Sequence, residues 1–278
     1  MSKCRVALIQ NKTFVGKINE NFKNYYNQIT SLIKENPDFI IVPELFLTGF
    51  DYKNLTNYKN EISCYLKEFQ SLLGNNTVLV LSLPEYDNDL IYNTTYFLSK
   101  SAILAKYRKN LLFAPSYENV YFSPQNNITL FCYHNIKIAT HTCYEIRFPE
   151  LFRMSYYFGA EIYFIPAVWP EDKKEHWLTL LKTRAIENQA FVIGCNCSQQ
   201  ITKNKTINCG YSAVFDPWGE KLLLASNEDD AYIVELNIEK VKEVREKIPC
   251  LEVAKNTFQV SFVDERVKNL DLISTNIN

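Results

Sequence analysis

The feature that most constrains the fold is an alternation of short apolar runs with helix-like segments along the chain. The short runs are rich in Val, Ile, Phe and Tyr, which suit the surface of a β-sheet. They predict strands at residues 4–10, 38–43, 77–83, 91–98, 128–133, 136–142, 161–166, 190–197, 210–216 and 231–236. The segments between them predict helices at residues 18–35, 55–73, 149–158, 174–188 and 238–247. This pattern predicts two sheets packed face to face and covered by helices.

The composition fits a globular protein with a large core. The chain has 278 residues, of which 47% are hydrophobic and 22% charged. Its formal net charge is −1, and no segment rich in Lys and Arg predicts nucleic-acid binding. No apolar run approaches the roughly 20 residues that span a bilayer, and residues 1–10 predict a core strand rather than a signal peptide. We therefore expect a cytoplasmic protein that has no membrane partner.

The domain organisation predicted is simple. No linker rich in Pro or Gly divides the chain, so we expect a single domain over residues 1–255. Residues 256–278 then form a C-terminal extension that could pack on a partner subunit.

The eight cysteines favour reduced thiols, because the chain is long, has no predicted signal peptide, and places most of them in apolar strands. A metal- or redox-binding protein that uses Cys195, Cys197 and Cys209 is an alternative of a different class. Paired zinc ligands usually have two to four residues between them, whereas one residue separates Cys195 from Cys197. No second pair follows, so the pattern gives this alternative little support.

Three segments place a reactive polar residue at the end of a predicted strand. Glu44 follows the apolar residues 39–43, and desolvation there would raise its pKa and suit a general base. Lys109 lies in a basic cluster that leads into an apolar stretch. Cys143 follows a predicted strand and precedes a helix predicted over 144–153 with an early interruption at Pro149. Free N–H groups at the start of that helix would lower the thiol pKa. Taken singly, each residue also fits an ordinary structural role.

In this order and spacing, the three segments resemble the signature segments of the nitrilase superfamily of carbon–nitrogen hydrolases. The matching residues are 42–45, 107–109 and 143–150, with further matches at 92–94 and 211–219. The resemblance implies an α/β fold, a four-layer α-β-β-α sandwich of two mixed sheets. It also implies a homodimer formed through helices next to the cysteine segment, and a reaction that needs no metal or cofactor.

The resemblance further implies a catalytic triad of Glu44, Lys109 and Cys143. Glu44 would take the thiol proton while Cys143 attacks an amide carbonyl and forms a thioester. The Lys109 ammonium and the backbone N–H of Tyr144 would stabilise the oxyanion. Glu118 is the only acidic residue between Lys109 and Cys143, and it is the candidate for a second glutamate common in the family. Its alternative role is that of a surface acid in a loop.

Residues 165–170 and 176–189 resemble the omega-amidase type within the superfamily, which includes bacterial 2-oxoglutaramate amidases. This implies cleavage of a small omega-monoamide of a dicarboxylic acid, such as 2-oxoglutaramate or succinamate, to the acid and ammonia. The alternative is an N-carbamoyl amino acid amidohydrolase or another small-amide hydrolase. By the resemblance, Trp169 would wall the substrate pocket. Arg147 could bind the substrate carboxylate or serve as a structural arginine.

The chain departs from the family pattern near two of the triad residues. Leu111 stands where the family usually has a histidine, and Glu145 stands where it usually has an aspartate. Because the triad is intact, these departures bear on substrate preference and rate and leave the reaction class unchanged. His141 lies two residues before the nucleophile, and we expect a structural role for it.

Overall fold

Two six-stranded sheets form the middle of the molecule. The computed structural model describes residues 3–250. The order in the first sheet is β15 (Asp230–Asn237), β1 (Lys3–Gln10), β3 (Phe39–Ile41), β4 (Val78–Asp87), β5 (Leu90–Leu98) and β6 (Ile103–Arg108). The order in the second is β14 (Lys221–Leu224), β13 (Ala213–Phe215), β10 (Phe191–Asn196), β9 (Ile162–Ala167), β8 (Ile136–Thr140) and β7 (Leu130–Tyr133). Each sheet has three parallel strands at its centre and antiparallel strands outside them.

Alternation of side chains along the strands builds the layers of the core. On β1, Val6 and Leu8 point into the apolar layer between the two sheets. Ala7 and Ile9 point the other way and pack against helices. Strands β3, β4, β9 and β10 divide their side chains in the same manner, so each sheet is apolar on both faces.

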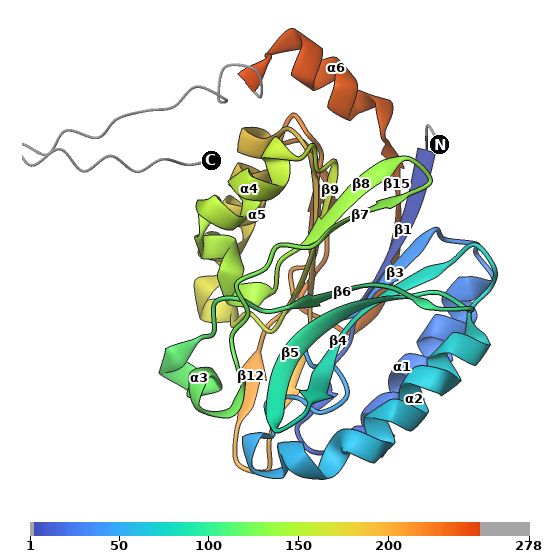
Figure 1. Cartoon of the computed structure of the whole chain (residues 1–278), viewed down its shortest axis with the longest axis vertical. Coiled ribbons are helices and arrows are strands. Elements are labelled where there is room, and N and C mark those ends of the chain that lie inside the picture. Colours follow the sequence, from blue (N-terminus) through green and yellow to red (C-terminus); the bar gives the residue numbers. More distant parts are fainter. Residues whose placement is uncertain (1–2, 251–278) are drawn as a thin grey trace, which may run out of the picture.

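Helices cover the outer face of each sheet (Figure 1). Helices α1 (Ile18–Ile33) and α2 (Lys59–Leu72) cover the first sheet, while α4 (Pro149–Tyr157) and α5 (Lys174–Asn188) cover the second. Gly194 on β10 permits the close approach of α5, since a Cβ there would lie 2.6 Å from Leu181. The predicted four-layer α-β-β-α sandwich is therefore confirmed. Helix α6 (Glu239–Lys247) follows β15 at the end of the described chain.

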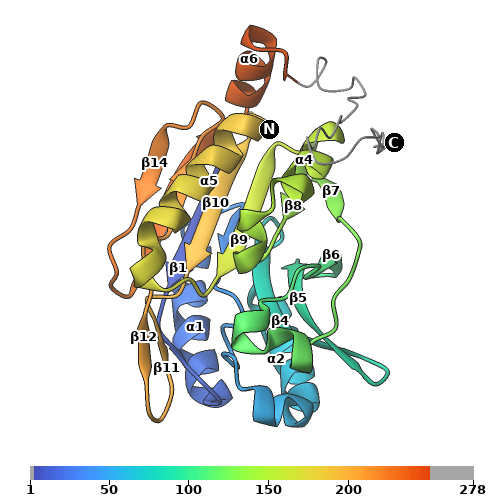
Figure 2. The same cartoon turned by 90° about the vertical axis from the view of Figure 1, so that its left-hand side faces the viewer.

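Shorter elements surround this frame. A small third sheet has the order β12 (Thr206–Asn208), β11 (Gln199–Ile201) and β2 (Thr13–Phe14), and Figure 2 shows its hairpin projecting below the second sheet. One further α-helix is a single turn, α3 (Glu118–Tyr121). The 3-10 helices are η1 (Tyr52–Tyr58), η2 (Ala114–Ser116), η3 (Cys143–Arg147) and η4 (Glu171–Lys173).

The structure differs from the sequence prediction in short and exposed elements. Strands β2, β6, β11, β12 and β14 were not predicted, because they are short or lie at sheet edges. Where a helix interrupted at Pro149 was predicted from Tyr144, the 3-10 helix η3 ends at Arg147, and α4 begins at Pro149, close to the predicted helix 149–158. Pro149 lacks the N–H that a continuous helix would need. The predicted domain end at 255 and the extension at 256–278 lie outside the described residues. Among residues 3–250, no helix is long and apolar enough to cross a membrane.

Candidate active site

The three predicted triad residues line one cavity. Glu44 lies three residues after β3, Lys109 directly follows β6, and Cys143 lies three residues after β8. They border a cavity of about 220 Å³, together with Glu118. The strands come from both sheets, so the cavity lies where the sandwich brings their ends together.

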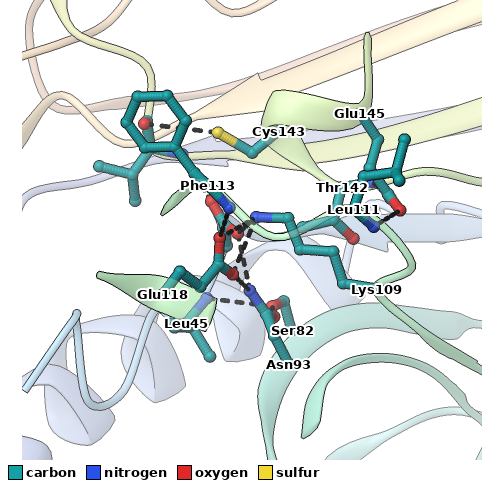
Figure 3. Close-up of polar contacts among 12 residues, drawn as sticks. Leu45, Ser82, Asn93, Lys109, Leu111, Phe113, Glu118, Thr142, Cys143 and Glu145 are labelled. Atoms are coloured by element: carbon teal, nitrogen blue, oxygen red, sulfur yellow. Dashed lines mark hydrogen bonds and ion pairs between the residues drawn. The ribbon is translucent and has the colours of Figure 1, made fainter. Parts of the chain in front are cut away.

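Lys109 is the centre of a buried ion cluster (Figure 3). Its Nζ donates to Glu44 Oε1 at 2.8 Å and to both carboxylate oxygens of Glu118 at 2.9 Å. The exposed fraction is 1% for the Lys109 side chain and 0% for both glutamates. Burial favours the neutral amine, but the charges of Glu118 and Glu44 outweigh it and raise the pKa of Lys109 well above its usual value. Lys109 therefore remains an ammonium, and Glu118 is not the surface acid that its alternative role required.

Asn93 completes this cluster from β5. Its Nδ2 donates to Glu44 Oε1 at 2.8 Å and to Glu118 Oε1 at 2.9 Å. Its Oδ1 accepts from Ser82 Oγ at 3.0 Å, and that hydroxyl accepts from the Leu45 N–H. The orientation of the Asn93 amide is thus fixed, and both carboxylates are held in place. Burial raises the pKa of Glu44 above its usual value, although the Lys109 charge opposes the shift.

Cys143 begins η3 with a left-handed backbone, at a φ of 49°. Its Sγ donates to the Val168 carbonyl at 3.5 Å, and the Val168 N–H donates to Glu44 Oε2 at 3.3 Å. Val168 therefore links the thiol with the carboxylate. Burial and the Glu44 charge raise the pKa of the Cys143 thiol well above its usual value. The lowered pKa expected from a helix N-terminus is wrong, because the five-residue η3 cannot offset this desolvation.

Glu145 joins the cysteine turn to the lysine segment. Its Oε2 accepts from the Thr142 N–H at 2.7 Å, as part of a capping box at the start of η3. Its Oε1 accepts from the Asn110 and Leu111 N–H groups at 2.7 and 3.1 Å. It also accepts from the Tyr107 hydroxyl at 2.8 Å. A single buried side chain thereby fixes the spacing between the segments that carry Lys109 and Cys143.

His141 lies in the core and does not line the cavity. Its Nδ1 and Nε2 lie 3.2 Å from the Tyr107 and Ser155 hydroxyls. Burial and the nearby Arg184 charge lower the pKa of His141 to about 3, so the ring is neutral. These contacts agree with the structural role expected for it.

The three residues predicted to bind the substrate, Tyr144, Arg147 and Trp169, all line the cavity. The Arg147 guanidinium lies 4.6 Å from the centroid of the Trp169 ring. Its Nη2 is 3.4 Å from Nδ1 of His176. Within the part of the chain that the structure describes, no carboxylate forms an ion pair with Arg147, so its charge is available to an anionic ligand.

Several residues of the site were not singled out from the sequence. Asn93, which contacts both carboxylates, lay in a segment already matched to the family, but the pattern gave it no role. The others line the cavity, and of these Val168 and Pro170 lie in the matched segment 165–170: Phe50, Tyr52, Phe113, Ser116, Val168, Pro170, Lys173, Gln200 and Ile207. The sequence gives these residues no signal of their own, because only the fold determines which of them reach the cavity.

Two cysteines of the alternative metal site, Cys197 and Cys209, lie with their thiol groups in hydrogen-bond contact. Cys195 Sγ lies in the core, where it donates to the Ile9 and Ile41 carbonyls at 3.3 and 3.5 Å. Over residues 3–250, no group of three or more His, Cys, Asp or Glu side chains could hold a metal ion. The pattern of Cys195, Cys197 and Cys209 reflects core packing at the base of the β11–β12 hairpin.

Comparison with known proteins gives consistent matches over nearly the whole described chain. The family model for carbon–nitrogen hydrolases matches residues 5–246. The 2-oxoglutaramate amidase of Bacillus subtilis (strain 168) is 34% identical over 255 residues, which cover 90% of this chain and 97% of that protein. Omega-amidase NIT2 of Xenopus tropicalis is 27% identical, with 90% of this chain and 94% of that protein covered. Saccharomyces cerevisiae Nit3, a member of branch 10 of the nitrilase superfamily, has a TM-score of 0.80 at 25% identity, with 89% of this chain and 95% of that chain covered.

Proposed function

Because this chain belongs to the carbon–nitrogen hydrolase family, we propose that it cleaves a small omega-monoamide of a dicarboxylic acid to the acid and ammonia. One observation carries the proposal: a thiol, an ammonium and two carboxylates line a cavity of about 220 Å³ that Arg147, which has no ion pair among residues 3–250, also lines. The names of two relatives, a 2-oxoglutaramate amidase and an omega-amidase, support the same substrate class.

In the first half of the proposed reaction, Glu44 accepts the proton of the Cys143 thiol as Sγ attacks the amide carbonyl carbon. A base is needed because burial keeps this thiol protonated at rest. The carbonyl π electrons move to oxygen, and the Lys109 ammonium and the Tyr144 N–H stabilise that oxyanion. Loss of one such donor typically raises the barrier by ~2.7–4 kcal/mol.

Collapse of the tetrahedral intermediate then breaks the carbon–nitrogen bond. Protonated Glu44 gives its proton to the departing nitrogen, ammonia leaves, and a thioester to Cys143 remains. Water attacks the thioester while Glu44 takes its proton, and the thiolate is released and reprotonated. Glu118 acts as a positioning residue, because both of its oxygens hold Lys109 at 2.9 Å.

We assign the far end of the substrate to the side of the cavity that Arg147 and Trp169 form. A guanidinium can bind a carboxylate through two parallel hydrogen bonds. The Trp169 ring keeps Arg147 in place by stacking, and the Trp169 indole Nε1 donates to the Lys173 carbonyl at 2.9 Å. The homodimer and the cytoplasmic location expected from the sequence remain predictions, and light scattering would test the first.

Ammonia release from a panel of amides tests the proposed function. We expect 2-oxoglutaramate or succinamate to be cleaved with a higher kcat/KM than the uncharged amide of the same length. An N-carbamoyl amino acid would release carbon dioxide together with ammonia, and a preference for it would contradict the substrate class. Absence of ammonia release from every amide in the panel would contradict the reaction itself.

A further inference from the structure

The β11–β12 hairpin supplies one wall of the cavity. Gln200 on β11 and Ile207 on β12 are register partners, and both line the cavity. Backbone bonds fix the base of the hairpin, from the Cys209 N–H to the Ser198 carbonyl at 2.8 Å and from the Gly210 N–H to the Cys197 carbonyl at 2.7 Å. The hairpin therefore holds its side chains at a defined position relative to the cavity.

Gln200 has an unusual polar environment. Its side chain is 5% exposed, and its amide nitrogen is buried with no hydrogen-bond partner in the described part of the chain. A buried donor without a partner costs free energy, and native structures contain few of them. Rotation about the terminal torsion of glutamine is soft, so the amide can turn its N–H group toward a ligand in the cavity. Binding of an oxygen acceptor there would supply the missing partner.

The neighbouring residue on the same strand provides a contrast. Gln199 Nε2 donates to Asn208 Oδ1 at 3.1 Å, and Gln199 does not line this cavity. Alternation along β11 directs the two side chains to opposite faces. Of these two glutamines, the one whose amide nitrogen has no partner is therefore the one on the face of β11 that borders the cavity.

Cations lie on the same side of the cavity as this hairpin. Lys173 and Ile207 both line the cavity, and both also line an adjoining surface hollow. Lys173 thus lies near Ile207, the register partner of Gln200. The Lys173 carbonyl accepts from the Trp169 indole N–H, and the Arg147 guanidinium lies over the Trp169 ring. Glu44 Oε1 and both Glu118 oxygens accept from Lys109 or Asn93, while Glu44 Oε2 accepts from the Val168 N–H. The Lys173 ammonium already pairs with Asp172 at 2.8 Å, so the positive charge offered to an anionic group on the hairpin side comes from Arg147, beside the Gln200 amide.

We propose that Gln200 is a specificity-determining residue, whose amide N–H binds the carboxylate oxygen at the end of the substrate remote from the scissile amide. This proposal rests on the proposed function, since it assumes a dicarboxylic monoamide as substrate. The hairpin thereby selects for an acidic substrate, in addition to Arg147.

The test compares succinamate with butyramide, which has a methyl group in place of the carboxylate. Gln200→Leu removes the hydrogen bond at similar volume, and Gln200→Glu adds a repelling charge. We expect Gln200→Leu to lower the kcat/KM ratio of succinamate to butyramide by roughly 10- to 100-fold, the range for a hydrogen bond to a charged group. Gln200→Glu should lower it further, with butyramide cleavage retained in both variants. Gln199→Leu is the matched control, for which the ratio should stay at the wild-type value.

Stability provides a second measurement. Because the Gln200 nitrogen has no partner in the described part of the chain, Gln200→Leu should unfold at the same or a higher temperature than the wild type. An unchanged substrate ratio in Gln200→Leu and Gln200→Glu would overturn the role of Gln200 while leaving the proposed function intact. A wild-type enzyme that cleaves butyramide as well as succinamate, or cleaves neither, would overturn both.

Discussion

Replacing Lys109 with methionine should destabilise the protein far more than the same change at an exposed lysine. Lys109→Met keeps much of the apolar stem and removes the ammonium. It leaves Glu44 and Glu118 buried at 0% exposure, with Asn93 as the donor that they share. Removal of one partner from a buried ion pair costs about 3–5 kcal/mol, because the remaining charge is uncompensated. We expect a loss of unfolding free energy in that range at pH 8.

The loss should depend on pH. Two buried carboxylates without a cation favour uptake of a proton, so the folded variant binds more protons than the unfolded chain above pH ~4.3. Its stability therefore falls as pH rises, by up to about 1.4 kcal/mol per pH unit for each proton taken up. Between pH 5 and pH 8, the difference in unfolding free energy between Lys109→Met and the wild type should be smallest near pH 5 and largest at pH 8.

Urea unfolding at both pH values measures this effect, with Lys106→Met as the control. Lys106 lies on β6, the strand that Lys109 follows; its side chain is 47% exposed, and its partner Glu85 also binds Arg108. The Lys106 ammonium is solvated, and Glu85 keeps Arg108 as a partner when it is removed, so we expect a loss of ~0–1 kcal/mol, as for a surface ion pair. If Lys109→Met costs no more than Lys106→Met at pH 8, the ion cluster does not have the energetic role assigned to it. Addition of Glu118→Gln should restore part of the stability of Lys109→Met but none of its activity.

Three further predictions address individual residues. Glu44→Gln should lower kcat by roughly 10²- to 10⁴-fold, the usual contribution of a general base, with little change in product binding by calorimetry. Arg147→Leu should raise KM for succinamate and leave KM for butyramide unchanged. An equal loss of activity on both substrates would indicate a structural arginine. Because the pKa of His141 is lowered to about 3, its neutral ring contributes stability above pH ~6.5 that is lost as pH falls toward 3. In urea unfolding, His141→Gln should reduce the dependence of the unfolding free energy on pH between about 3 and 6.5. An unchanged pH dependence would refute the role given to the neutral ring.

The frame of the fold could be predicted from the sequence because its central strands are buried on both faces. Runs such as 39–42 and 78–81 have no exposed positions, so a continuous apolar run predicts them well. Edge strand β6 has one buried residue, Tyr107, and contains Lys106 and Arg108, so it was missed. The short strands β11 and β12 were missed for a related reason, since polar three-residue strands carry no periodic signal.

The order of the motifs allowed the central site residues to be identified from the sequence. Their burial and the direction of the thiol pKa shift could not be predicted in this way. The sequence placed Glu44, Lys109, Glu118 and Cys143 near one another, and the structure brings all four to one cavity. It gave the wrong direction for the thiol pKa, because burial is a property of the whole fold whereas the helix-dipole argument used only local sequence. Gln200 could not be found at all, since its lack of a partner depends on contacts across the assembled structure.

Mass spectrometry of the acyl-enzyme tests the central claim most directly. The wild type would be acid-quenched during succinamate turnover and digested. We predict a succinyl thioester on the peptide that contains Cys143, and no adduct or ammonia release in a folded Cys143→Ala variant. A succinyl group on another residue, or ammonia release by Cys143→Ala near the wild-type rate, would contradict Cys143 as the nucleophile.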